Sequence, residues 1–473
     1  MRRAKIVCTL GPATADDGVL DNLISAGLDV ARMNFSHGSH ADHAANFHRV
    51  RAAADKHGKA VALLADLQGP KIRLGRFAQG SVDLVVGARF TITIDDVAGD
   101  VDRCSTTYKG LPGDVKVGDR LLIDDGRLVL TAVEVTATDV VTEVVVGGPC
   151  SNNKGINLPG AAVSVPALSE KDIEDLRYAL HLGVDWVALS FVRSANDYLD
   201  VRRIMDEEGI VVPVVAKVEK PQAVDNLEEV VDAFDGIMIA RGDLGVEMPL
   251  EVVPLVQKRA ISLARQYGKP VIVATQMLET MISAQRPTRA EVSDVANAVL
   301  DGADALMLSG ETSVGEDPVH VVQTMASIIE YTEHGGLDRL PPLDMPPTDG
   351  TARAVTHAAA EVAEQIQARY LVAFTETGTS AALVARHRSK VPVLAFTPTV
   401  KVRNQLALLW GVETFCVPAA THTDDMVRQV DLALLNLGRV TSGERIVVVA
   451  GVPPGIPGTT NGIRVHRIGH AVV

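Results

Sequence analysis

Short apolar runs alternate with amphipathic helical patterns along most of the chain. Apolar runs bounded by turn residues predict buried strands. Three runs precede residue 67 and five more lie between residues 184 and 309, and a helical pattern follows most of them. Eight parallel strands that alternate with helices make a (β/α)8 TIM barrel, so the pattern predicts this α/β fold. The predicted strands are residues 4–10, 28–35, 60–66, 184–191, 212–219, 234–241, 269–275 and 303–309.

The pattern changes between the third and fourth predicted strands. Residues 72–165 carry short Val, Thr and Ile runs with turn signals and no helical period, which predicts a compact all-β module. The helical pattern resumes after Ser169, which forms a predicted capping box with Asp172. We therefore predict a barrel domain in residues 1–69 and 166–336, and an inserted all-β domain after strand 3 in residues 70–165.

A smaller α/β unit follows a Pro-rich segment at residues 337–351. Its apolar runs, separated by helical patterns, predict an open parallel sheet within residues 350–473. The runs are RYLVAF, VPVLAF, ETFCV and RIVVVAGV.

Composition narrows the class of protein. A net charge of −14 and an aromatic content of 4% argue against a nucleic-acid partner. The four cysteines, Cys8, Cys104, Cys150 and Cys416, lack the spacing of a zinc site and suit reduced thiols. Neither a signal peptide nor a membrane-length apolar run is present in the sequence, so we expect a cytoplasmic protein with no membrane partner.

Polar residues collect where the predicted strands end. In a TIM barrel these ends meet at one face, where active sites lie. Solvent alone could explain one polar strand end, but polar residues at six ends favour a shared site. The strand-end residues are Arg32, Asn34, Asp66, Lys217, Glu219, Arg241, Asp243, Thr275, Ser309 and Glu311.

Two of these carboxylates could hold a metal ion. Glu219 and Asp243 end consecutive strands, and two carboxylates with room for substrate oxygens suit Mg²⁺ or Mn²⁺. Lys217 lies two residues before Glu219, so both side chains face the same way. Cations beside a metal pair suggest a bound phosphoryl group. The alternative is that Lys217 and Arg241 neutralise the two acids without any metal.

Several long motifs, in order, resemble those of pyruvate kinase over almost the whole chain. They are KIVCTLGPAT, ARMNFSHG, LADLQGPKIR, NNKGINLPG, VAKVEK, GIMIARGDLGVEMP, ATQMLETM and LSGETSVG. The resemblance implies that phosphoenolpyruvate and ADP, with Mg²⁺, give pyruvate and ATP. It also implies that the inserted domain of residues 70–165 is a mobile β-barrel lid, that the C-terminal unit is a regulatory domain, and that the protein is a homotetramer.

The resemblance assigns roles residue by residue. Lys217 would stabilise the transferring phosphoryl group, and Arg32 would clamp the substrate phosphate. Glu219 and Asp243 would bind Mg²⁺. The backbone of Gly242 and Asp243, with Thr275, would hold the substrate carboxylate. The candidates for a water-linked relay that protonates the enolate are Thr275, Ser309 and Glu311. The expected nucleotide-binding residues are Asn34, Ser36, His37, Arg73 and Lys154, although a structural role for His37 is equally open.

The stretch LADLQGPKIR departs from the potassium-dependent form of the family, which resembles DTKGPE here. In that form the Thr joins the equivalents of Asn34, Ser36 and Asp66 around K⁺. This chain has Leu67 at the Thr position and Lys71 at the Glu position. We expect the Lys71 ammonium to supply the charge of K⁺, so that K⁺ is not required. The alternative is a solvated hinge lysine with K⁺ still bound.

A hydroxyl-rich loop in the C-terminal unit could hold a phosphate, because it precedes a helix. It comprises Thr375, Thr377, Gly378, Thr379 and Ser380. A capped loop without a ligand is the alternative. The resemblance places a phosphorylated effector here. Basic residues that would bind a second phosphate lack a firm equivalent in residues 451–467. This argues against fructose 1,6-bisphosphate and leaves AMP or a hexose monophosphate as at least equal candidates.

Two other functions remain open from sequence. One is a different Mg²⁺-dependent barrel enzyme of phosphoenolpyruvate or pyruvate, which would need neither the lid nor Arg73 and Lys154. The other is a non-catalytic metabolite sensor, which predicts a broken barrel site.

Overall fold

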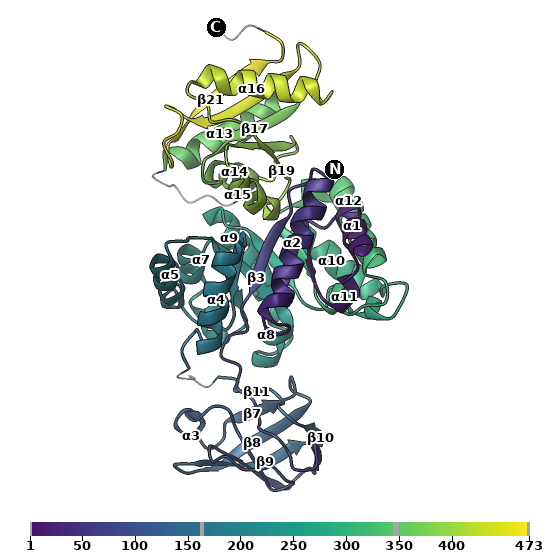
Figure 1. The fold of residues 1–473 in the computed structure, drawn as a ribbon, viewed down its shortest axis with the longest axis vertical. Coiled ribbons are helices and arrows are strands. Elements are labelled where there is room, and N and C mark those ends of the chain that lie inside the picture. The colour runs from purple at the N-terminus through teal and green to yellow at the C-terminus, as the bar shows by residue number, and fades with distance from the viewer. Residues whose placement is uncertain (1, 161–164, 344–349, 471–473) are drawn as a thin grey trace.

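The computed structural model describes residues 2–160, 165–343 and 350–470. Part of the predicted Pro-rich segment, residues 344–349, lies outside the described residues. Three bodies follow one another along the long axis, with the barrel between the β module and the C-terminal unit (Figure 1). The described residues contain no helix that is both long and apolar enough to cross a membrane.

The eight predicted barrel strands are confirmed. They pair in parallel and close in the order β1-β16-β15-β14-β13-β12-β3-β2. Each lies inside its predicted apolar run, because a parallel barrel strand is buried on both faces. The strands are β1 Lys5–Thr9, β2 Val30–Asn34, β3 Ala62–Asp66, β12 Trp186–Leu189, β13 Val214–Val218, β14 Gly236–Ala240, β15 Val271–Ala274 and β16 Ala305–Leu308.

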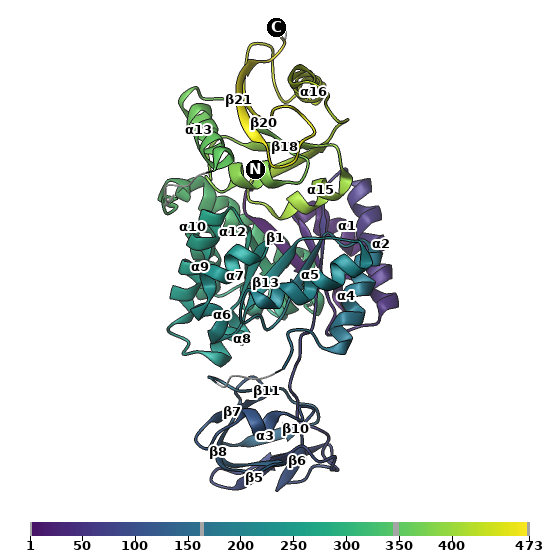
Figure 2. The same ribbon diagram turned by 90° about the vertical axis from the view of Figure 1, so that its left-hand side faces the viewer.

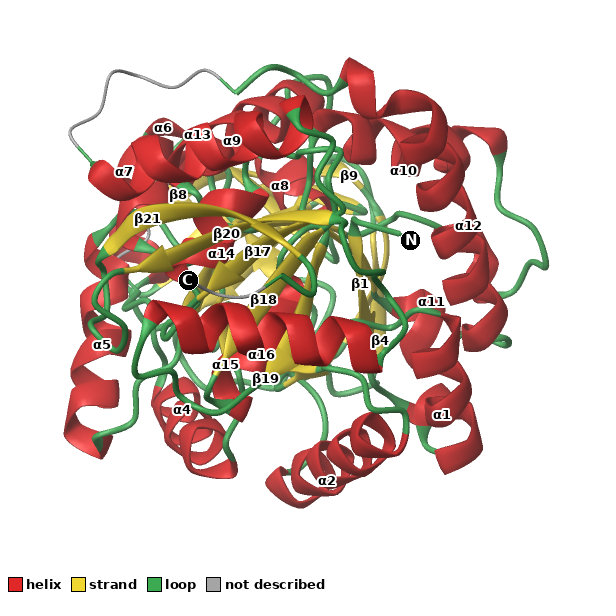
Figure 3. Cartoon of the chain, turned by 90° about the horizontal axis from the view of Figure 1, so that it is seen from above, coloured by secondary structure: helices red, strands yellow, loops and turns green. Residues whose placement is uncertain are grey.

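Helices surround the barrel, as the view from above shows (Figure 3). The predicted capping box at the start of α4 is confirmed, because Ser169 Oγ accepts a hydrogen bond from Asp172 N at 3.1 Å. The helices are α1 Asp17–Ala26, α2 His40–Lys56, α4 Glu170–Leu182, α5 Asn196–Glu208, α6 Pro221–Asp225, α7 Leu227–Ala233, α8 Arg241–Glu247, α9 Val253–Tyr267, α10 Arg289–Asp301, α11 Gly310–Ser313 and α12 Pro318–Gly336, with short 3₁₀ turns η1 Pro12–Thr14, η2 Glu279–Ile282 and η3 Leu337–Arg339.

The inserted module lies beyond one end of the barrel (Figure 2). It contains a six-stranded sheet, in the order β11-β7-β8-β9-β5-β6, and a separate β10-β4 pair. One short helix, α3 Leu111–Asp114, interrupts the predicted all-β module. The strands are β4 Ser81–Leu84, β5 Arg89–Thr93, β6 Arg103–Ser105, β7 Arg120–Ile123, β8 Leu128–Val135, β9 Asp139–Val146, β10 Gly148–Ser151 and β11 Ile156–Asn157.

The C-terminal unit corrects one prediction, because its sheet is not entirely parallel. Strand β21 pairs antiparallel with β20 at the edge of the order β19-β18-β17-β20-β21. The outward-facing Ile463 and Val465 alternate with polar residues, a weaker signal than the buried runs. The elements are α13 Thr351–Gln365, β17 Tyr370–Phe374, α14 Thr379–Ala385, β18 Val393–Thr397, α15 Val400–Gln405, η4 Leu406–Leu408, β19 Val412–Cys416, α16 Thr423–Asn436, β20 Arg445–Gly451 and β21 Thr460–Arg467.

A buried carboxylate ties this unit to the base of the barrel. Asp304, just before β16, accepts from Arg388 Nη2 at 2.8 Å and from Trp410 N at 3.1 Å. The Arg388 guanidinium also stacks 4.9 Å from the Trp410 ring centroid. Arg386 donates to Gln266 O, at the end of α9, at 3.0 Å. Barrel and C-terminal unit therefore share one polar interface.

His387 lies in this interface among cations. Its Nε2 has no hydrogen-bond partner, and its ring lies 5.1 Å from that of His357. Burial, together with the neighbouring Arg386, lowers the pKa of His387 to about 3. The imidazole is therefore neutral in the folded protein at every moderately acidic pH.

We predict that His387 makes the fold acid-sensitive. The unfolded imidazole takes up a proton near its ordinary pKa of about 6.5, but the folded one does not. Stability present above that pH is therefore lost as the pH falls toward 3, by about 1.4 kcal/mol per pH unit. Urea unfolding at pH 7.5 and 5.5 should show a smaller loss for His387→Gln than for the wild type. Exposed His48→Gln is the control, and equal losses in all three proteins would contradict the prediction.

Candidate active site

Four charged side chains meet at the mouth formed by the C-terminal ends of the barrel strands. Asp66 Oδ2 accepts from Arg32 Nε at 2.7 Å, and Asp66 Oδ1 lies 3.3 Å from Lys217 Nζ. Lys217 Nζ also lies 2.8 Å from Glu219 Oε1. Strands β2, β3 and β13 therefore deliver these side chains into one buried ion cluster, which we call the mouth cluster.

The mouth cluster fixes its own charge states. Asp66 and Glu219 are each 1% exposed. Burial acts to raise the pKa of Asp66, but Lys217 and Arg32 outweigh it and the pKa is lowered. Burial acts to lower the pKa of Lys217, yet Asp66 and Glu219 raise it above its ordinary value. Lys217 therefore stays a cation at any pH at which the protein works.

The pKa of Glu219 is shifted in the opposite direction from that of Asp66. Burial raises its pKa, Lys217 opposes that rise, and nearby Asp243 adds to it. A divalent cation would relieve the repulsion that Asp243 exerts on the charged form of Glu219.

Two hydroxyls support the mouth cluster and were missed from sequence. Ser190 Oγ accepts from Lys217 Nζ at 2.7 Å and donates to Leu67 O at 2.7 Å. Thr9 Oγ1 accepts from Arg32 Nη1 at 2.9 Å. Both follow the strand-end pattern, since Thr9 ends β1 and Ser190 follows β12.

The residues of the predicted metal pair fit a divalent cation. Asp243 lies in the first turn of α8, directly after β14. Among the described contacts its carboxylate makes no hydrogen bond or ion pair, and it lines a hollow between barrel and lid. No group of three or more His, Cys, Asp or Glu side chains in the described residues could hold a metal. A two-carboxylate site completed by substrate oxygens suits Mg²⁺.

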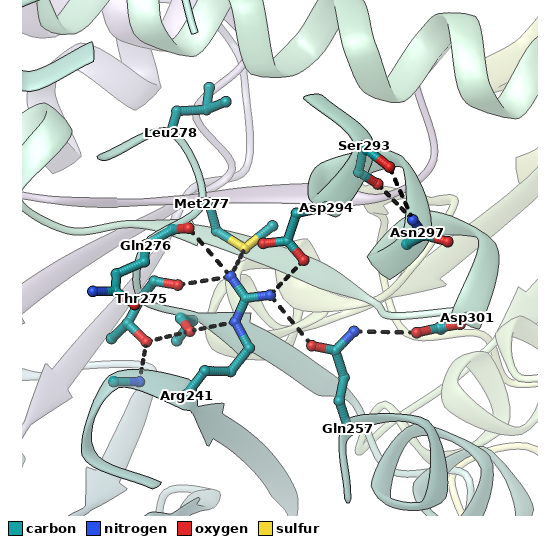
Figure 4. A network of polar contacts seen from close by, with 12 residues as sticks. Arg241, Gln257, Thr275, Gln276, Met277, Leu278, Ser293, Asp294, Asn297 and Asp301 are labelled. Carbon is teal, nitrogen blue, oxygen red and sulfur yellow. Dashed lines mark hydrogen bonds and ion pairs between the residues drawn. The ribbon is translucent and has the colours of Figure 1, made fainter. Parts of the chain in front are cut away.

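Gly242 and Thr275 are brought together beside this pair. Gly242 N donates to Thr275 Oγ1 at 2.7 Å. Thr275 and Gln276 both adopt left-handed backbone angles, with φ of 68° and 53°. The Arg241 guanidinium lies against the carbonyl oxygens of this turn (Figure 4). Arg241 therefore does not neutralise Glu219 or Asp243, because its ion pair is with Asp294 at 2.7 Å.

The residues of the predicted relay are neighbours without direct bonds between them. Glu311 is fully buried, and its carboxylate accepts from Ser309 N at 2.6 Å and from Leu278 N at 3.2 Å. Within the described residues, no hydrogen bond joins the hydroxyls of Thr275 and Ser309 to each other or to the Glu311 carboxylate. Glu311 thus braces the loops after β15 and β16, and the water-linked relay remains a prediction.

Part of the predicted nucleotide side surrounds one hollow of about 720 Å³. Arg32, Asn34, His37 and Ser309 line it. Ser36 follows in the same loop, where its N–H donates to Asn34 Oδ1 at 3.1 Å.

Arg73 and Lys154 are not brought to this hollow. Both lie on the lid, where Arg73 Nη1 donates to Asn153 O at 3.1 Å and Lys154 Nζ pairs with Asp124 at 2.8 Å. They can join the nucleotide side only if the lid moves toward the barrel.

Lys71 is exposed at the hinge and lines the hollow that also contains Asp243. The structure does not bring it to Asp66, whose ion pairs are with Arg32 and Lys217. Asp66 is thus paired with protein cations, but these are Arg32 and Lys217 and not the expected Lys71.

The hydroxyl loop of the C-terminal unit lines a separate hollow. Gly378 N donates to Thr375 Oγ1 at 2.9 Å, and Ser380 Oγ lies 2.6 Å from Thr460 Oγ1. Thr377 and Thr379 also line this hollow, together with residues 455–460. The residues that line it include no Lys, Arg or His.

Comparison with known proteins matches both the barrel and the C-terminal unit to domains of pyruvate kinases. Residues 1–322 match the pyruvate kinase barrel domain, and residues 353–466 match the pyruvate kinase alpha/beta domain. A pyruvate kinase of Corynebacterium glutamicum is 60% identical over 470 residues, which cover 99% of this chain and 98% of the relative. A pyruvate kinase of Mycobacterium tuberculosis is 58% identical over 468 residues, covering 99% of each chain.

A crystal structure of a pyruvate kinase from Cryptosporidium parvum superposes with a TM-score of 0.92 at 34% identity. The match covers 99% of this chain and 96% of that one. These matches set aside both the other barrel enzymes and the non-catalytic sensor. The chain belongs to the pyruvate kinase family.

Proposed function

We propose that the mouth cluster and its neighbours carry out the family's reaction, phosphoryl transfer from phosphoenolpyruvate to ADP to give pyruvate and ATP. The observation that carries this proposal is the permanently charged Lys217 between Asp66 and Glu219, beside Arg32. Phosphoryl transfer needs positioning and charge stabilisation more than covalent chemistry. A buried cation that cannot lose its proton is suited to that task.

Lys217 and Arg32 would face the phosphoryl group. Lys217 supplies a fixed positive charge to the equatorial oxygens, and Arg32 orients the group from β2. Glu219 and Asp243 would hold Mg²⁺, which, when bound, adds positive charge next to the transferring group.

The start of α8 and the turn after β15 would bind the substrate carboxylate. The N–H groups of Gly242 and Asp243 lie at a helix N-terminus, which favours an anion. The Thr275 hydroxyl is held against Gly242 N and can turn toward the same anion. Ser309 and Glu311 would supply the proton to the enolate through water.

ADP would occupy the hollow beside Arg32, Asn34 and His37, with Ser36 in the same loop. Closure of the lid would add Arg73 and Lys154 from above. It would also exclude water, which otherwise competes with ADP for the phosphoryl group.

The lid hinge would replace the potassium ion. Lys71 lies at the start of the lid domain, next to its connection with the barrel, so lid closure would change the position of its ammonium group relative to the barrel. The Leu67 side chain offers no oxygen ligand, its backbone carbonyl already accepts from Ser190 Oγ, and Asp66 has two protein cations as partners. These facts support an enzyme that does not require K⁺.

The hollow of the C-terminal unit would bind an effector with one phosphate. Hydroxyls and backbone N–H groups can hold a phosphate monoester without a formal cation. A bisphosphate such as fructose 1,6-bisphosphate would bring a second dianion, with no basic side chain lining the hollow to meet it. AMP or a hexose monophosphate fits better.

We also infer that the protein is a homotetramer in the cytoplasm. The edge strand β21 exposes apolar Ile463 and Val465, which supports assembly through this edge. All four cysteines are free, as expected of a reducing compartment.

Lys217→Met is predicted to lower turnover by at least 10³-fold, because it removes the fixed charge from the phosphoryl site. Mg²⁺ binding should persist, since Glu219 and Asp243 remain. Pyruvate formation and Mn²⁺ binding by electron paramagnetic resonance measure the two effects. Lys56→Met, at an exposed ion pair on α2, is the control. Retained turnover in Lys217→Met would contradict the assignment.

Turnover in potassium-free buffer is predicted to be within about twofold of turnover with saturating K⁺. Lys71→Glu should lose most activity without K⁺ and regain part of it with K⁺, because a carboxylate attracts the ion that the ammonium replaces. Steady-state assays in tetramethylammonium and potassium buffers test this. A wild-type enzyme active only with K⁺ would contradict the role of Lys71.

AMP or glucose 6-phosphate is predicted to lower the phosphoenolpyruvate concentration needed for half-maximal rate several-fold, whereas fructose 1,6-bisphosphate should not. Thr379→Val should weaken this activation at least tenfold, because it removes one phosphate-facing hydroxyl while keeping the shape. Thr421→Val, outside the hollow, is the control. Activation by the bisphosphate alone would refute the one-phosphate site.

A further inference from the structure

One guanidinium organises the turn that follows β15. Arg241 is the first residue of α8, and its side chain extends beneath the turn (Figure 4). Its Nε donates to Ala274 O at 3.3 Å, and its Nη2 donates to Thr275 O at 2.8 Å. Nη2 also lies 3.4 Å from Gln276 O and 2.8 Å from Met277 Sδ. Three consecutive carbonyl groups thus face the same cation.

The turn needs such support, because its backbone is strained. Thr275 and Gln276 have φ of 68° and 53°, although neither is glycine. A β-branched residue in this region is a clear outlier, and each such residue costs about 1–3 kcal/mol. The carbonyl groups of the turn point at Arg241. In this conformation Thr275 Oγ1 accepts a hydrogen bond from Gly242 N at 2.7 Å. The strained backbone therefore decides where this hydroxyl is held.

The guanidinium is itself held by two helices outside the mouth. Asp294 Oδ1, on α10, accepts from Arg241 Nη1 at 2.7 Å. Gln257 Oε1, on α9, lies 3.4 Å from the same nitrogen, and Gln257 Nε2 donates to Asp301 at 3.1 Å. The Arg241 side chain is only 13% exposed. The ion pair with Asp294 and the contact with Gln257 thus hold the guanidinium in place without a substrate.

We propose that Arg241 is a positioning residue of the reaction, which acts through Thr275 by holding the turn of residues 274–276 in its left-handed conformation. Arg241 does not itself touch the substrate. Lysine cannot replace it, because one ammonium has three donors and no planar fork, whereas this site uses the guanidinium on both sides. The inference rests on the proposed role of Thr275 at the substrate carboxylate.

A purely structural role would look different. If Arg241 only attached α10 to the barrel, its loss would lower stability and reduce activity regardless of the side chain at position 275. If Arg241 acts through Thr275, its loss should matter only while the Thr275 hydroxyl is present. A double-mutant cycle separates the two cases.

The cycle uses full-length wild type, Arg241→Lys, Thr275→Val and the double variant. Valine keeps the shape and backbone preference of threonine but lacks the hydroxyl. Each protein is assayed for kcat and KM with phosphoenolpyruvate and ADP, and for phosphoenolpyruvate binding with Mg²⁺ by calorimetry. We expect Arg241→Lys alone to lower kcat/KM about tenfold or more. The double variant should stay within twofold of Thr275→Val.

Two further variants keep the test decisive. Asp294→Asn leaves Arg241 in place but weakens its anchor, so it should show a smaller loss with the same dependence on Thr275. It replaces Arg241→Lys in the cycle if thermal unfolding shows that the lysine variant does not fold. Asn297→Ala, on the same helix, is the matched control. Among the described residues the Asn297 side chain bonds only Ser293 of its own helix, so its loss should leave kcat/KM unchanged (Figure 4).

Each outcome decides the proposal. An equal fold-loss from Arg241→Lys in the wild-type and Thr275→Val backgrounds would overturn it, as would wild-type activity in both Arg241→Lys and Asp294→Asn. The binding measurement separates this inference from the proposed function. A wild-type protein without turnover, whose phosphoenolpyruvate binding still shows the coupling, would overturn the proposed chemistry and keep the role of Arg241.

Discussion

The burial of charge at the barrel mouth is the constraint on which the rest of the structure depends. Asp66, Lys217 and Glu219 are largely buried. A buried ion without a partner would cost several kcal/mol. Each therefore needs a partner at hydrogen-bond distance, and the partners come from different strands. Neighbouring parallel strands in fixed register deliver them to one point. The apolar strand bodies supply that rigidity, and the site uses it.

Much of this arrangement was predictable from the sequence. The eight strands followed from apolar runs, and the convergence of Arg32, Asp66 and Lys217 followed from polar residues at their ends. Ser190 and Thr9 obeyed the same rule but lacked a charge that would draw attention to them. The partners of Arg241 could not be predicted, because Asp294 and Gln257 lie on helices whose rotation about the barrel has no signature in one sequence. The position of Lys71 depends on how the lid is placed relative to the barrel. The sequence around Lys71 does not determine that placement.

The site combines rigid and movable parts. Glu311 and Arg241 bind backbone groups of the loops after β15 and β16, so the substrate side is held from behind by fully or largely buried groups. In the proposed reaction the nucleotide side would be divided between barrel and lid, because Arg73 and Lys154 lie on the inserted module. The substrate side would then be set by folding, and the nucleotide side would be completed by lid closure.

Asp304 carries a consequence for how the chain can be divided. Its two carboxylate oxygens accept from Val271 N inside the barrel, and from Arg388 and Trp410 of the C-terminal unit. A barrel cut free of that unit would lose the cation that pairs with Asp304, and the removed unit would expose Arg388 and Trp410 without their carboxylate partner. The two parts are therefore separate in topology but not interchangeable modules. Recombination between relatives should succeed only where the carboxylate, the guanidinium and the indole are inherited together.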